Sequence, residues 1–265
     1  MSTFANLDYI KHHQHVSVPD GVRVFVVGDV HGCKKLLMDA LHSVGFDFDK
    51  DYLFCVGDLI DRGPNNYDTV KLFNDEPRFF CVMGNHDLFA VAEQLDMWWF
   101  NGGAWAFDGH NPIVLDVGNR YIVDTKFQNM LLKLPIVLDF TFAGKFYGMI
   151  HGGFPNTGVI GSYLDNDWDK LQPCLERFQD SAIEKLVWDR EVIEAARDGF
   201  DAPDVKNVEY VFHGHSYVPT PKFVNNRIYI DTGGVFNGKL TLAEVHATGL
   251  ITFTTTDKGD QRVTQ

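Results

Sequence analysis

The chain has 265 residues, of which 45% are apolar, so it is long enough to form one large α/β domain around a sizeable core. Its formal net charge of −13 argues against non-specific nucleic-acid binding, which requires a basic surface. No apolar run is long enough to cross a membrane, the first 14 residues do not follow the pattern of a secretory signal, and the four cysteines show no CxxC spacing. These features predict a globular cytoplasmic protein that binds neither membranes nor nucleic acid.

The first 20 residues are polar and are expected to be irregular. Their histidine-rich stretch, residues 11–15, could bind a metal, but a solvated surface segment is the preferred interpretation. From residue 22 the chain repeats one pattern three times: an apolar strand, a polar loop with glycine, and a segment with helical periodicity. The strands are expected at 22–27, 52–56 and 79–83, and the helices at 36–44, 65–76 and 88–95. This alternation predicts parallel strands whose loops share one edge of the sheet.

The second half of the chain contains shorter elements. Residues 97–107 are rich in aromatic residues and glycine, which favours a packed cap; a wall of a pocket is the alternative. A helix is expected at 121–134, stopped by Pro135, then strands at 136–142 and 146–150, a loop at 156–169, a helix at 182–187 and a loop at 198–205. The closely spaced strands at 208–212, 223–224, 228–230 and 240–245 predict antiparallel pairing.

Together the two halves predict an α/β fold, namely a β-sandwich of two mixed sheets flanked by helices. The active site is expected in loops at the carboxyl ends of strands. Because the sequence shows neither an internal repeat nor a linker, residues 1–265 are expected to form a single domain.

Five predicted loops carry side chains of the kind that bind metal ions. Any one of them alone is weak evidence of a site, because an Asp after a strand can cap a helix and a His-Gly pair can form a turn. Their joint occurrence, each after an apolar strand, points instead to a metal site. Oxygen and imidazole ligands together suit Mn, Fe or Zn better than Mg or Ca. The residues are Asp29 and His31, Asp58, Asn85 and His86, His151, and His213 with His215.

The loop Gly57-Asp58-Leu59-Ile60-Asp61-Arg62-Gly63 is central to this prediction. Two cations ~3.5–4 Å apart need a bridging ligand, and Asp58 is the candidate. Asp29 and His31 would complete the shell of one ion, and three further residues that of the other. A hydroxide bridging the two ions would then attack a phosphoryl group in line. The three further ligands are Asn85, His151 and His215.

Other side chains near these loops have roles in the same chemistry. His86 is the candidate acid that protonates the leaving oxygen, and Asp61 would hold its tautomer. Arg62 and Arg190 would bind phosphate oxygens through their guanidinium groups. The simpler interpretations are a local Asp61–Arg62 salt bridge and, for Arg190, a surface charge at a helix end.

Three of the loops resemble the signature motifs of the PPP-type metallophosphoesterases, the family of serine/threonine protein phosphatases. They are Gly28-Asp29-Val30-His31-Gly32, the central loop, and Gly84-Asn85-His86-Asp87. Segments 101–105, 188–191, 214–216 and 230–236 resemble the bacteriophage lambda type of this family and its bacterial relatives. Asp87 in place of the usual Glu, Ser216 in place of the common Thr, and the additional His213 depart from the family pattern.

The resemblance implies a metallophosphoesterase fold and two divalent ions, usually Mn²⁺, with Fe or Zn as alternatives. It implies that His86 and Asp61 form the acid pair and that Arg62, Arg190 and Asn85 contact phosphate. The metal ligands that it implies are Asp29, His31, Asp58, Asn85, His151 and His215. It leaves His213 outside the metal shell.

The predicted function is therefore hydrolysis of phosphoserine, phosphothreonine and often phosphotyrosine in phosphoproteins or phosphopeptides. A symmetrical dinucleoside polyphosphate (Ap4A) hydrolase shares the first three motifs and is the alternative enzyme. A scaffold without catalytic activity is the non-enzymatic alternative. The physiological substrate and the oligomeric state are left open.

Overall fold

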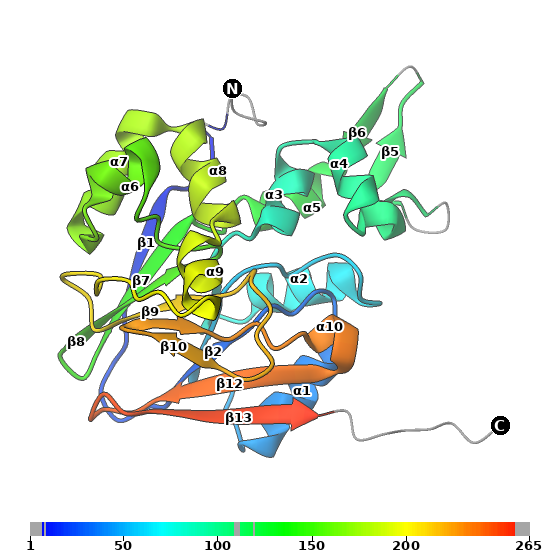
Figure 1. The fold of residues 1–265 in the computed structure, drawn as a ribbon. Coiled ribbons are helices and arrows are strands. Elements are labelled where there is room, and N and C mark those ends of the chain that lie inside the picture. Colours follow the sequence, from blue (N-terminus) through cyan, green and yellow to red (C-terminus); the bar gives the residue numbers. More distant parts are fainter. Residues whose placement is uncertain (1–6, 8, 109–111, 119, 258–265) are drawn as a thin grey trace.

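The computed structural model describes residues 7, 9–108, 112–118 and 120–257, and its two larger sheets pack face to face (Figure 1). The five-stranded sheet has the order β13 (Ile251–Asp257), β12 (Lys239–Val245), β2 (Val24–Val27), β3 (Tyr52–Cys55), β4 (Phe79–Cys81). The six-stranded sheet has the order β1 (His13–Ser17), β7 (Val137–Phe142), β8 (Lys145–Ile150), β9 (Tyr210–His213), β11 (Arg227–Tyr229), β10 (Lys222–Val224). The prediction of two mixed sheets flanked by helices is confirmed.

The core has two main parts. One lies between the two sheets, and the other lies between the five-stranded sheet and the helices on its outer face. Val24 and Val26 join a cluster with residues of both sheets, in which the rings of Phe54 and Phe140 stack with centroids 4.3 Å apart. Phe25 and Val27 point the other way, into the larger core that includes the helices. Strand β2 is apolar on both faces because both faces are covered.

Strands β2, β3 and β4 are parallel and adjacent, as predicted. Each is followed by a loop and a helix: α1 (Lys34–Ser43), α2 (Asn66–Asp75) and α3 (Asn85–Val91). The loops 28–33, 56–65 and 82–84 therefore lie at one edge of the sheet, at the carboxyl ends of the strands. This arrangement brings the three polar loops together.

The aromatic region forms an extension at one side of the sheets, between α3 and β7 (Figure 1). It contains α4 (Leu95–Phe100), the 3₁₀ helix η1 (Gly103–Phe107), the hairpin β5 (Val114–Asp116) and β6 (Tyr121–Val123), and α5 (Thr125–Leu131). The expected helix at 121–134 was wrong at its start, because Tyr121–Val123 pairs with β5. The side chain of Asp124 then caps α5 by accepting from the Phe127 amide at 2.8 Å. The helix expected at 88–95 corresponds to α3, which begins earlier, at Asn85, and already ends at Val91.

Several other expectations differ from the structure. Residues 1–20 are not wholly irregular, because β1 pairs in parallel with β7. The predicted loop at 156–169 contains α6 (Gly158–Leu164) and the start of η2 (Trp168–Lys170), followed by α7 (Leu171–Phe178), α8 (Asp180–Trp188) and α9 (Glu191–Arg197). The strands of the second half are not all antiparallel: β9 is parallel to β8 and β11. The helices between β8 and β9 supply the long crossover that parallel pairing requires.

The described part of the chain contains no helix long and apolar enough to cross a bilayer. Its four cysteines are buried, including Cys55 and Cys81 in neighbouring strands. That residues 1–265 form one domain stays a prediction.

Candidate active site

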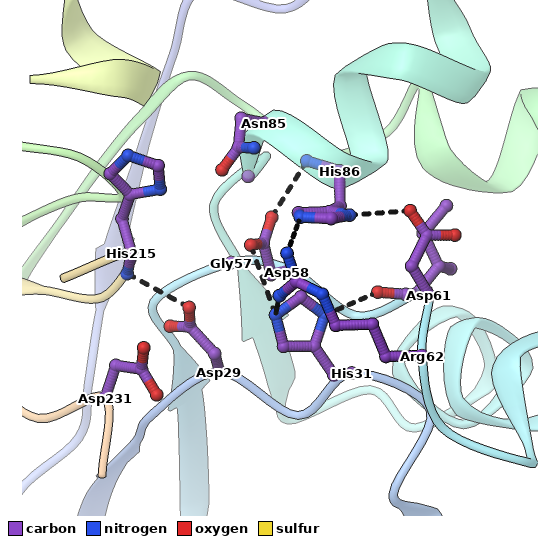
Figure 2. Close-up of polar contacts among 12 residues, drawn as sticks. Asp29, His31, Gly57, Asp58, Asp61, Arg62, Asn85, His86, His215 and Asp231 are labelled. Carbon is purple, nitrogen blue, oxygen red and sulfur yellow. Dashed lines mark hydrogen bonds and ion pairs between the residues drawn. The ribbon is translucent and has the colours of Figure 1, made fainter. Parts of the chain in front are cut away.

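A cavity of about 280 Å³ lies where the strand-end loops meet. Eight of the predicted site residues line it: Asp29, His31, Asp58, Arg62, Asn85, His86, Arg190 and His215. The remaining two, Asp61 and His151, are fully buried and contact residues that line the cavity. Figure 2 shows the side chains of the first three loops and of His215 pointing toward one centre.

Asp58 lies at the centre of this arrangement. Its carboxylate belongs to two groups of closely spaced metal-type donors, one with His31 and His86 and the other with His151 and His215. Asp58 Oδ2 lies 3.5 Å from His31 Nε2 and 3.3 Å from His151 Nε2. One carboxylate shared by two donor groups is the arrangement that a pair of cations requires.

The histidines of these groups present the right nitrogen. His31 Nδ1 donates to the Ile60 carbonyl at 2.7 Å, which leaves its Nε2 as the acceptor. His151 Nδ1 donates to the Val56 carbonyl at 2.7 Å, and its Nε2 faces the oxygens of Asn85 and Asp58. Burial is outweighed by the Asp58 charge, which raises the pKa of His151, so this imidazole would lose a proton when it binds a metal. Burial, only partly offset by the Asp58 charge, lowers the pKa of His31 to about 3. Burial, together with the neighbouring His151 and Arg190, lowers the pKa of His215 to about 2. These two imidazoles are therefore neutral at pH 7, which is the form that binds metals.

Asp29 supplies a buried oxygen that needs a partner. Its Oδ2 accepts from the His215 amide at 3.0 Å, whereas Oδ1 has no hydrogen-bond partner among the described residues. Burial and the charges of Asp231 and Asp58 raise the pKa of Asp29 well above its usual value. An unpaired carboxylate oxygen beside two further carboxylates is costly without a cation. The residues therefore fit a divalent metal centre.

The backbone at this site is unusual. His31, Asp58, Asp61, Arg62 and His215 all have φ between 45° and 78°, a region that side-chain-bearing residues rarely occupy. Gly84 has an ordinary φ of −88°, but a Cβ at this position would overlap the Asp58 carboxylate. Strained backbone and close approach concentrated at one cluster are typical of a functional site.

His86 is held by a chain of hydrogen bonds. Its Nδ1 donates to Asp61 Oδ2 at 2.6 Å, and Asp61 Oδ1 accepts from the indole N–H groups of Trp98 and Trp105, each at 2.8 Å. The carboxylate of Asp61 is therefore engaged by His86 and the two indoles, rather than by a salt bridge to Arg62. The cap is packed, because Trp98 is fully buried, and it also forms part of the cavity wall through Asn101.

The two arginines donate to imidazole nitrogens in the cavity. Arg62 donates from Nη1 to His31 Nε2 at 2.6 Å and from Nη2 to His86 Nε2 at 2.7 Å. Arg190 Nε donates to His215 Nε2 at 2.9 Å. Arg190 thus lies in the cavity, not only on the surface at the start of α9. Both guanidinium groups are placed to reach an anion bound in the cavity.

Asp87 joins two of the loops. It accepts from the Leu59 and Gly84 amides, each at 3.0 Å, and so ties the Asp58 loop to the start of α3. Burial and the charge of Asp58 raise the pKa of Asp87 to about 8. This residue, noted only as a departure from the family pattern, is a structural link of the site.

His213 lies outside both donor groups. It is fully buried, donates from Nδ1 to the Ile150 carbonyl at 3.0 Å, and stacks on Tyr229 with ring centroids 4.9 Å apart. Of the histidine-rich stretch, His13 and His15 each contact a carboxylate oxygen of Asp139 at 2.6 Å. This stretch is therefore not a wholly solvated segment, and its residues 13–15 lie in β1, on the six-stranded sheet.

Sequence reasoning gave no role to several residues that line the cavity: Asn101, Trp188, Tyr217, Asp231 and Phe236. Asp231 follows the buried strand β11 and Ile230, so an acid after a strand was the signal that could have found it. No comparable signal marked the aromatic residues.

Comparison with known proteins supports the fold. Serine/threonine-protein phosphatase 2 of Escherichia coli is 28% identical over 88% of this chain and 97% of its own length. An asymmetrical bis(5′-nucleosyl)-tetraphosphatase of Bacillus mycoides is 24% identical over 82% of this chain and 87% of its own. A symmetrical bis(5′-nucleosyl)-tetraphosphatase of Ectopseudomonas mendocina is 43% identical, but over only 26% of each chain.

Among solved structures, a serine/threonine phosphatase of Saccharomyces cerevisiae with similarity to human PP5 superposes with a TM-score of 0.60. It is 14% identical and covers 94% of this chain and 84% of its own, so the likeness concerns the fold alone. The model of the calcineurin-like phosphoesterase family matches residues 22–219, well over half of the sequence. The chain therefore belongs to the calcineurin-like phosphoesterase family.

Proposed function

We propose that this chain is a metal-dependent phosphoprotein phosphatase that hydrolyses phosphoserine, phosphothreonine and also phosphotyrosine monoesters. The observation that carries the proposal is the carboxylate of Asp58 shared by two donor groups, directly beside the His86–Asp61 pair. The similarity to the Escherichia coli phosphatase, which extends over nearly the whole length of that protein, supports the substrate class.

The metal centre would be held by the six residues predicted from the sequence. When bound, two divalent ions supply Lewis-acid polarisation of phosphoryl oxygens and activation of water, and Mn²⁺ is the ion we expect. The ligands are Asp29, His31, Asp58, Asn85, His151 and His215.

The other residues act on the substrate. Arg62 and Arg190 bind the phosphoryl oxygens; for this, each guanidinium must exchange its imidazole contact for the anion. Asn85, which lines the cavity, contributes a further amide contact. Water adds to phosphorus, the phosphorus–oxygen bond to the alcohol breaks, and inorganic phosphate and the free hydroxyl are the products.

His86 supplies the proton for the leaving oxygen. Arg62 can only donate and an ionised carboxylate can only accept, so the contacts of neutral His86 fix its proton on Nδ1 and make Nε2 the acceptor. Once Arg62 has exchanged this contact for the phosphoryl group, Nε2 can bind the proton that His86 then delivers to the leaving oxygen. Asp61 stabilises the protonated imidazole, and the two indoles in turn hold Asp61. General acid catalysis of this kind accelerates reactions by ~10²–10⁴-fold.

The proposal is tested by measuring bound metal and activity on one preparation. Phosphoserine, phosphothreonine and phosphotyrosine peptides, p-nitrophenyl phosphate and diadenosine tetraphosphate should be compared with Mn²⁺, Fe²⁺, Zn²⁺ and Mg²⁺. We expect Mn²⁺-dependent hydrolysis of phosphopeptides that exceeds hydrolysis of diadenosine tetraphosphate. The reverse order would favour the dinucleoside polyphosphate hydrolase, and a folded protein without bound metal or activity would favour the scaffold.

A further inference from the structure

The mouth of the active-site cavity carries two aromatic side chains that the proposed mechanism does not use, Phe236 and Tyr217. Phe236 is 74% exposed and Tyr217 is 47% exposed, so neither ring is needed to fill the core. Single exposed aromatic residues are common, but two that line the same polar cavity are more informative.

The local fold places the two rings on one wall. Phe236 lies on α10 (Gly234–Asn237), a single turn bounded by Gly233 and Gly238, both with left-handed backbone. A Cβ on Gly233 would lie only 3.0 Å from Tyr217 Cε2, so the absence of a side chain there lets the Tyr217 ring pack against the turn. The amide of Phe236 donates to the Gly233 carbonyl at 3.0 Å, and this hydrogen bond holds the backbone that carries the Phe236 ring.

The wall adjoins the phosphate-binding group. Arg62 Cζ lies 5.2 Å from the centroid of the Phe236 ring. A phosphate bound by Arg62 is therefore close to Phe236, and Phe236 is the neighbouring ring for an aryl group esterified to that phosphate. Aromatic pairs attract at centroid distances of ~4.5–7 Å. The side chain of phosphoserine offers no ring for this contact.

We propose that Phe236 and Tyr217 form an aromatic subsite for the leaving group, which favours aryl phosphomonoesters such as phosphotyrosine over alkyl phosphomonoesters. This inference extends the proposed function, because it assigns to that site a preference within phosphoprotein substrates. Aromatic pairing beyond simple area burial corresponds to ~2- to 13-fold in affinity or kcat/KM.

The test compares Phe236→Leu, which keeps apolar bulk but removes the ring, with Phe236→Tyr, which keeps the ring. kcat/KM is measured for phosphotyrosine and phosphoserine peptides of one sequence. The ratio of the two values should fall ~2- to 13-fold in Phe236→Leu and stay near wild type in Phe236→Tyr. Phe200→Leu is the matched control, because Phe200 is 69% exposed but does not line the cavity.

An unchanged ratio of the two kcat/KM values in Phe236→Leu would overturn the proposal. If both values fall by the same factor, Phe236 only supports Arg62. Calorimetric affinities of the Mn²⁺-loaded protein for phenylphosphonate and methylphosphonate give a second readout. In Phe236→Leu the ratio of these two affinities should fall by the same factor as the kcat/KM ratio. If wild type hydrolyses diadenosine tetraphosphate but neither peptide, the proposed function fails, while the phosphonate ratio still decides whether the subsite exists.

Discussion

Replacing Asp61 by Asn tests the acid pair with little change of shape. In the structure the carboxylate accepts one hydrogen bond from His86 and two from indoles, at 2.6, 2.8 and 2.8 Å. An amide cannot accept at both ends. If the nitrogen of the new amide faces His86, it meets the Nδ1–H of His86, and both groups are donors. If the amide nitrogen faces the indoles, the N–H groups of Trp98 and Trp105 lose their acceptor. The substitution therefore disrupts the network in either orientation.

The expected fall in kcat follows from the loss of the Asp61 charge. A hydrogen bond to an ionised group contributes ~1.5–3 kcal/mol, which corresponds to ~10- to 150-fold in a rate that depends on the protonated imidazole. We therefore expect kcat for a phosphoserine peptide to fall by at least ~10-fold in Asp61→Asn, toward the ~10²–10⁴-fold that general acid catalysis supplies. Metal content should not change, because Asp61 belongs to neither donor group.

The assay uses two leaving groups. The alkoxide of serine needs a proton, whereas p-nitrophenolate leaves readily without one, so the loss should be much smaller with p-nitrophenyl phosphate. His86→Asn should show the same pattern of kcat loss. It should also keep its metal, because the six proposed ligands do not include His86, although His86 lies in one of the two donor groups. Equal losses on both substrates, or a parallel loss of metal, would refute the assignment of His86 and Asp61 as a general acid pair.

Three other substitutions test separate features. Gly84→Ala should reduce metal content and should lower activity by ~5- to 150-fold, since overpacking costs ~1–3 kcal/mol and its Cβ would displace Asp58. Gly234→Ala, whose Cβ would meet no atom closer than 3.4 Å, should have little effect. Burial of Asp139 is outweighed by hydrogen bonds from its two histidine partners, so the pKa of Asp139 is below the usual value. The ionised Asp139 therefore stabilises the fold above pH ~4, and this contribution to the free energy of unfolding is lost as the pH falls. Urea denaturation of Asp139→Asn should therefore show a loss of ~1–3 kcal/mol at pH 7 that narrows in acid, and a constant difference would contradict this. His213→Gln should retain wild-type metal content by elemental analysis, whereas loss of an ion would place His213 among the ligands.

The first half of the fold could be predicted because its signals are local. Apolar runs such as Tyr52–Cys55 and the polar loops after them identify the strands and the edge where the site lies. The same logic predicts that Asp29, Asp58 and Asn85 meet at one site, and all three line the cavity.

The rest depends on contacts distant in sequence. Strand β1 has a polar sequence and is joined to β7 by hydrogen bonds between His13, His15 and Asp139, more than 120 residues away. Phe236 and Tyr217 reach the cavity only because the turn at α10 and the loop after β9 fold back over it. No periodicity or spacing encodes such placement.

The most direct test of the metal centre is the number of divalent ions retained per chain by wild type and by Asp58→Asn after gel filtration, measured by elemental analysis alongside phosphopeptide hydrolysis. Because Asp58 is shared by both donor groups, wild type should retain two ions, and Asp58→Asn should lose metal and activity together. An active wild type with fewer than two ions, or an Asp58→Asn variant that keeps both, would contradict the account.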